Sequence, residues 1–231
     1  MEKNQYNLCI DILNVLQTSG ALKHVVLIGS WAMKFYANYF KSESYMPVIQ
    51  TRDIDFLVPI PVKVSDNVDI QKLFEDLGFI RSFYGDKGYI KFEHPDLIVE
   101  FLVPERGRGI NRPYDIPELG INATALRYLD FLEENTITVT IEGIRVKVPH
   151  PAAYALHKCI VFERRKKKDK KEKDFEGALR VLNELIKNKK RADIRKVFQT
   201  MHKKWQKTVM DNLSRAGEDE IAEYLRGLIE R

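Results

Sequence analysis

Cysteine is scarce in this chain of 231 residues, and long apolar runs are missing. Cys9 and Cys159 lie far apart in apolar surroundings, which excludes a small domain held together by disulfides. Lys, Glu and Asp interrupt every apolar segment well before the roughly 18 residues that a membrane helix needs. The first twenty residues lack the basic start and apolar core of an export signal. We therefore expect a cytoplasmic protein that makes no use of a membrane.

Several widespread motifs are missing too. The chain contains no Walker A pattern, no Gly-x-Gly-x-x-Gly, no His-Glu-x-x-His and no Cys-x-x-Cys. The usual sequence evidence for a P-loop ATPase or a dinucleotide-dependent enzyme is therefore absent.

The composition that remains is that of a globular protein, with 44% apolar and 31% charged residues. The net charge of +5 is concentrated in residues 163–173, where eight bases accompany three acids. This segment is either a solvated linker or a tether for the phosphates of a nucleic acid. Because the segment has no aromatic residue, base stacking is not expected there.

Helix and strand patterns alternate in the first half of the chain. Strands are expected over residues 24–28, 51–58, 79–84, 89–92 and 97–103, and helices over residues 5–19, 30–40 and 68–77. A proline-rich loop over residues 104–117 follows.

The second half has mainly helical spacing. Helices are expected over residues 123–132, 151–162, 175–186, 194–209 and 221–229, and a hairpin over residues 136–148 that turns at Glu142-Gly143. The predicted fold class is α/β (α+β): a mixed-sheet domain over residues 1–117, followed by a mainly helical domain with a small β-hairpin over residues 118–231.

Two aspartates stand out in the expected strand 51–58. Side chains alternate between the faces of a strand, so Asp53 and Asp55 project together while Ile54 and Phe56 project to the other side. Two neighbouring carboxylates repel each other, and a divalent cation removes that cost. The alternative is that both aspartates lie at an exposed strand end beside Arg52.

A third carboxylate, Glu100, is the one charged residue of the apolar segment 97–103. Its side chain either faces solvent from a sheet edge or faces a positively charged group. Asp96, at the start of the same strand, is the weaker candidate for this role.

Gly29 and Ser30 lie between a strand and a helix. Glycine lets the backbone approach a ligand closely, and a helix N-terminus offers free N–H groups to phosphate oxygens. The alternative is that Gly29 only permits the turn and Ser30 only caps the helix.

Taken together, these segments resemble the DNA polymerase β-type nucleotidyltransferase superfamily. They are most similar to bacterial nucleotidyltransferase-like proteins and to AbiEii-type toxin nucleotidyltransferases. The resemblance spans residues 24–187 and rests on the segments 28–32, 51–57, 125–132, 148–151, 156–158 and 173–175.

The resemblance implies transfer of a nucleoside monophosphate from an NTP to a hydroxyl, with two Mg²⁺ ions as cofactor. Asp53, Asp55 and Glu100 would be the catalytic metal ligands, and Gly29 and Ser30 would hold the terminal phosphates. We expect Ser30 within about 15 Å of the two aspartates, because metal and phosphates must meet on one triphosphate.

Two further residues join the nucleotide site by the resemblance. Lys158 would contact NTP phosphates, and Asp174 would support activity. By physics alone, a lysine in an apolar helix either pairs with an anion or extends its ammonium to solvent, and an acid at a helix start favours the dipole.

The partner that accepts the nucleotide is open among RNA, a protein hydroxyl and a small molecule. A different class of function is a catalytically silent nucleotide-binding or interaction protein, for instance one half of a toxin–antitoxin pair. It would be indicated by carboxylates that are splayed apart or paired with Arg52 or with lysines.

Overall fold

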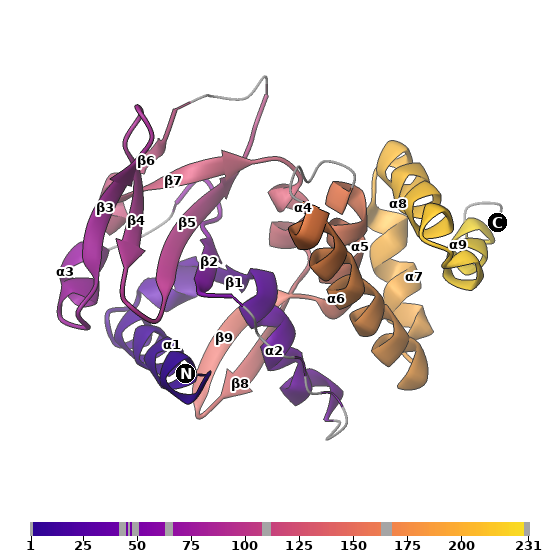
Figure 1. The fold of residues 1–231 in the computed structure, drawn as a ribbon, viewed down its shortest axis with the longest axis horizontal. Coiled ribbons are helices and arrows are strands. Elements are labelled where there is room, and N and C mark those ends of the chain that lie inside the picture. The colour runs from indigo at the N-terminus through magenta and orange to yellow at the C-terminus, as the bar shows by residue number, and fades with distance from the viewer. Residues whose placement is uncertain are drawn as a thin grey trace. The chain divides into compact units, whose positions relative to one another are not determined.

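The computed structural model describes residues 2–41, 45, 47, 51–62, 67–107, 112–162 and 168–228. The chain divides into two compact units, the first formed by Met1–Tyr39 with Met46–Pro149 and the second by Phe40–Tyr45 with His150–Arg231 (Figure 1). Residues 118–149, which the sequence analysis assigned to the second domain, thus cluster with the first unit.

A mixed sheet forms the centre of the first unit. Its strands follow the order β1-β2-β5-β4-β3, and β7 pairs with both β5 and β6. The pairs β2/β5 and β5/β7 are parallel and the others are antiparallel. The strands are β1 (Val26–Ile28), β2 (Asp53–Leu57), β3 (Ile80–Tyr84), β4 (Tyr89–Glu93), β5 (Ile98–Pro104), β6 (Tyr114–Ile116) and β7 (Ile121–Leu126). The predicted α/β (α+β) class is confirmed.

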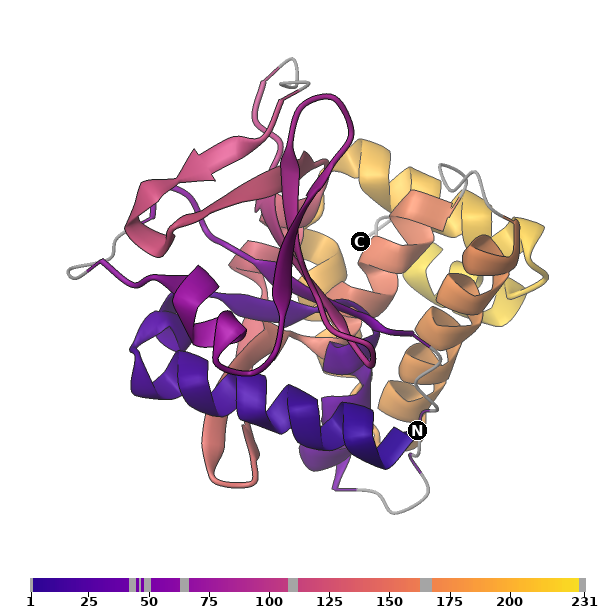
Figure 2. The same cartoon turned by 60° about the vertical axis from the view of Figure 1, so that its left-hand side comes forward.

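One face of this sheet carries a cluster of phenylalanines. Phe101 on β5 stacks on Phe56 of β2 with ring centroids 5.7 Å apart, and it lies 6.3 Å from both Phe74 and Phe92. Phe74 comes from α3 (Ile70–Glu75), which packs beside α1 (Glu2–Thr18), as Figure 2 shows. Burial of these rings holds α3 to the sheet.

The predicted hairpin is present as β8 (Thr136–Ile141) and β9 (Ile144–Pro149). Strand β9 packs against β1, and the hydroxyl of Tyr36 in α2 (Gly29–Phe40) donates a hydrogen bond of 2.8 Å to the Pro149 carbonyl. These contacts explain why the hairpin belongs to the first unit.

The expected helix over residues 123–132 is wrong in its first half. Residues 121–126 form β7, and only α4 (Leu129–Glu134) is helical. Ala and Leu favour a helix, but pairing with β5 and β6 overrides that preference. The expected loop 104–117 also contains β6.

The second unit is helical in its described part. Its helices are α5 (Pro151–Val161), α6 (Lys168–Lys187), α7 (Arg191–Thr200), α8 (Lys203–Arg215) and α9 (Asp219–Arg226). The single helix expected over residues 194–209 is wrong, because Met201 is extended and the His202 ring accepts a hydrogen bond from the Lys204 N–H as the cap of α8. Within the described ranges, no helix is long and apolar enough to cross a membrane.

The basic segment is described only in part. Residues 163–167 lie outside the described residues, and residues 168–173 form the first turns of α6, where Lys171 Nζ lies 4.2 Å from the centre of the Phe162 ring. The helix therefore begins earlier than expected.

Candidate functional site

The two aspartates of β2 share one face of the sheet. Asp53 and Asp55 are half-buried. Ile54 and Phe56, which alternate with them along β2, are fully buried on the opposite face, where the phenylalanine cluster lies. The Thr51 hydroxyl donates to Asp53 Oδ2 at 3.3 Å and accepts from the Asp53 N–H at 3.1 Å, which orders the start of the strand. The carboxylates thus reach solvent from a rigid apolar base.

The glycine–serine turn lies directly against this strand. Ile28 is the register partner of Asp55, and Gly29 follows it with φ +71°. A Cβ placed on Gly29 would lie 2.7 Å from Asp55 Oδ2. The Asp55 carboxylate therefore contacts Gly29, the first residue of α2, where the helix dipole favours negative charge. Ser30 is the next residue of this helix.

Gly29→Ala is expected to destabilise the first unit by about 1–3 kcal/mol, from the left-handed backbone and from displacement of Asp55. Gly85→Ala is the matched control, because Gly85 has φ +65° but nothing within 4 Å of its Cβ position. Urea denaturation of both variants isolates the contact with Asp55. Equal losses in the two variants would mean that Gly29 serves the turn alone.

Glu100 lies beside Asp55 in the sheet. The parallel register pairs Asp55 with Glu100, so the two side chains share a face on strands about 4.8 Å apart. The Glu100 carboxylate is engaged by the ammonium of Lys91 on β4. Asp96 lies in the turn before β5, with its carboxylate 3.8 Å from His94 Nδ1. Of the two acids weighed for the third position, Glu100 is the one in line with the aspartates.

On the same face of the sheet as Asp55 and Glu100, side chains of β4 and β3 are joined by hydrogen bonds. Glu93 of β4 accepts hydrogen bonds from the Tyr84 hydroxyl and, at 2.7 Å, from the Ser82 hydroxyl. The bond from Tyr84, followed by that from Ser82, holds the pKa of Glu93 below its usual value. Lys91 Nζ lies 4.8 Å from the centre of the Tyr84 ring. Sequence reasoning missed Lys91, Glu93 and their partners, because no local pattern marks them.

The donor set suits a hard cation. In the part of the chain that the structure describes, no three His, Cys, Asp or Glu side chains are grouped closely enough to hold a metal ion. Mg²⁺, however, keeps several waters and binds through one or two carboxylates together with substrate phosphates. Asp53 and Asp55 supply such oxygens, and Gly29 leaves the Asp55 carboxylate the space that a Cβ would fill. The residues present therefore fit this cation.

Lys158 and Asp174 come together in the second unit. Lys158 on α5 donates a hydrogen bond of 2.9 Å to Asp174 Oδ1 on α6, and the two side chains are only 9% and 15% exposed. The anion that the lysine was expected to need is therefore supplied within the chain.

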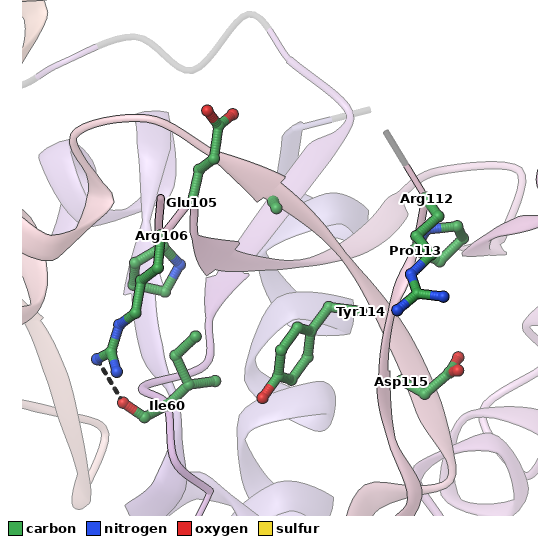
Figure 3. A pocket seen from close by; sticks show the side chains of 9 residues that line it. Ile60, Glu105, Arg106, Arg112, Pro113, Tyr114 and Asp115 are labelled. Atoms are coloured by element: carbon green, nitrogen blue, oxygen red, sulfur yellow. Dashed lines mark hydrogen bonds between the residues drawn. The ribbon is translucent and has the colours of Figure 1, made fainter. Parts of the chain in front are cut away.

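A cavity of about 300 Å³ lies elsewhere in the first unit, at the ends of β5 and β7 (Figure 3). Arg106 reaches the Ile60 carbonyl at 2.6 Å, while Glu105 points the other way and binds Arg127 at 2.9 Å. Two arginines and two acids line the cavity, so the charges of its lining balance and favour neither anionic nor cationic ligands. None of the predicted site residues is among its described lining.

A nucleotidyltransferase family model, NTP_transf_8, matches residues 7–203. The chain belongs to this nucleotidyltransferase family. The match confirms the resemblance to nucleotidyltransferases that the sequence motifs indicated. As a member of this family, the protein is a transferase enzyme. No curated protein matches the chain significantly.

The solved structures to which this nucleotidyltransferase is similar have low sequence identity to it. ANT(2")-Ia in complex with adenylyl-2"-tobramycin is 14% identical, with a TM-score of 0.46 over 82% of this chain and 99% of that chain. A nucleotidyltransferase-like protein from Paracoccidioides brasiliensis is 12% identical, with a TM-score of 0.49 over 95% of this chain and 92% of that chain.

Proposed function

We propose that this nucleotidyltransferase is Mg²⁺-dependent and moves a nucleoside monophosphate from an NTP to a hydroxyl acceptor. The acceptor oxygen bonds to the α-phosphorus, the bond from that phosphorus to the β-phosphate oxygen breaks, and pyrophosphate leaves. The observation that carries the proposal is the contact of Gly29 with Asp55, which places the turn proposed to bind phosphates beside the Asp53–Asp55 pair. Membership of the family supports it.

The proposed roles follow from where each side chain lies. Asp53 and Asp55 would hold two metal ions, and the main chain and hydroxyl at Gly29 and Ser30 would hold the terminal phosphates. Glu100 would hold the metal ion that activates the acceptor and would take the proton of the acceptor hydroxyl. Bound there, Mg²⁺ would stabilise the attacking and leaving oxygens.

Calorimetry with each NTP and Mg²⁺ tests this proposal. The double variant Asp53→Ala, Asp55→Ala is expected to bind the nucleotide at least about a hundredfold more weakly than the wild type, because both oxygen ligands are gone. Asp11→Ala with Asp76→Ala is the control, since it removes two exposed carboxylates of the same unit. No binding by the wild type, or equal binding by the double variant, would contradict the metal site.

One observation favours a second candidate, a catalytically silent nucleotide-binding protein. The ion pair of Lys91 with Glu100 is the kind of pairing that such a protein is expected to show. Incubation of cell extract with NTP labelled in its α-phosphate separates the two functions, since a silent protein binds the nucleotide but labels nothing.

The same experiment identifies the acceptor, because label appears in RNA, in protein or in a small-molecule fraction. A cytoplasmic location is part of the proposal, and a place in a toxin–antitoxin pair belongs to the second, silent candidate. Lys158 is proposed to contact NTP phosphates, with Asp174 as its counter-ion.

A further inference from the structure

Four side chains form a row across the carboxylate face of the sheet. Asp55 is in register with Glu100, Glu100 with Lys91, and Lys91 with Ser82. Neighbouring strands lie about 4.8 Å apart, so each member of the row is adjacent to the next. Lys91 is the positively charged member of this row. It lies on β4, the strand next to the one that carries Glu100, the proposed third metal ligand.

The ammonium of Lys91 has more than one place to bind. It engages Glu100 and lies 4.8 Å from the centre of the Tyr84 ring, a distance typical of a cation–π contact. Glu93 is two residues along β4 on the same face, and its charge is within electrostatic reach of Lys91. The side chains of Lys91 and Glu100 are 27% and 21% exposed, so water can assist exchange of one partner for another.

We propose that Lys91 is a positioning residue that holds Glu100 in an ion pair until Mg²⁺ and nucleotide displace its ammonium toward Tyr84 and Glu93. This inference rests on the proposed function. An ammonium and a metal ion compete for the same carboxylate oxygens, and both cannot neutralise Glu100 fully. Lys91 thereby sets the Mg²⁺ concentration at which the third carboxylate becomes available.

The test is the affinity for Mg²⁺ measured by calorimetry in the presence of a non-hydrolysable NTP analogue. Lys91→Gln removes the competing charge and is expected to bind Mg²⁺ at least about fivefold more tightly, which corresponds to an ion pair of about 1 kcal/mol. Lys91→Arg keeps the charge and is expected to resemble the wild type. Lys72→Gln is the control, since it removes an exposed charge of α3.

A double-mutant cycle identifies the carboxylate involved. In a Glu100→Gln background, Lys91→Gln is expected to change the affinity for Mg²⁺ by less than about twofold, because the acid for which the two cations compete is gone. Urea denaturation without metal checks that each variant is folded.

The two proposals fail in different ways. If the wild type binds no Mg²⁺ with the analogue, the proposed function fails, and this inference falls with it. If the wild type binds but Lys91→Gln binds equally or more weakly, the inference is overturned while the proposed function stands. An equal gain in the Glu100→Gln background would overturn it too, because the effect would then be one of general charge.

Discussion

Replacing Lys158 by Ala is expected to destabilise the second unit by about 3–5 kcal/mol. Lys158 and Asp174 join α5 to α6 through a hydrogen bond of 2.9 Å between largely buried side chains. Without the ammonium, the Asp174 carboxylate stays in a poorly solvated place and loses this hydrogen bond and ion pair. Urea denaturation followed by tryptophan fluorescence, to which Trp205 of this unit contributes, measures the loss.

Two comparisons complete this experiment. Lys158→Met with Asp174→Leu removes both charges and is expected to regain most of the stability. Lys187→Ala is the control, because that lysine is 65% exposed and pairs with Glu184 at 3.9 Å, so the change should stay within about 0.5 kcal/mol. A loss below about 1 kcal/mol for Lys158→Ala would contradict the account of a buried pair.

The apolar double variant also separates structure from function. Because it is expected to stay folded, a loss of its affinity for NTP would report contact of Lys158 with phosphate. Unchanged affinity would make the pair a purely structural link between the helices.

Phe101→Ala is expected to cost the first unit about 3–5 kcal/mol. Phe101 is 2% exposed and contacts three other rings, from β2, β4 and α3. The cavity left by its ring would loosen β5 where Glu100 is anchored. Phe83→Ala is the control, since Phe83 is 62% exposed and should change the free energy of unfolding by no more than about 0.5 kcal/mol. Similar losses in the two variants, measured by urea denaturation, would contradict a core organised on Phe101.

Elements with a clear local period were predictable from sequence. The strand of Asp53–Leu57 and the hairpin of β8 and β9 alternate at period two, and the structure has both. The strand β7 was not predictable, because its Ala and Leu residues favour a helix until β5 and β6 pair with them. The helix expected over residues 194–209 failed because its apolar spacing continues across the two-residue break at Met201 and His202.

The candidate site also has a part that could be predicted from the sequence and a part that could not. The shared face of Asp53 and Asp55 is a property of one strand and can be read directly. The pairing of Lys91 with Glu100 depends on the register of β4 against β5, and that of Lys158 with Asp174 depends on the packing of α5 against α6. Neither relation is local, so the sequence showed the charges without showing their partners.

The alternation of β2 also limits how the length of this chain can change during evolution. Ile54 and Phe56 are buried while Asp53 and Asp55 face the other side. One inserted residue within the strand would exchange the faces, placing carboxylates among the phenylalanines and phenylalanine in solvent. The turn at Glu142-Gly143, where nothing lies within 4 Å of the Gly143 Cβ position, can lengthen without that penalty. Insertions among relatives should therefore gather at such turns and avoid the strand that carries the aspartates.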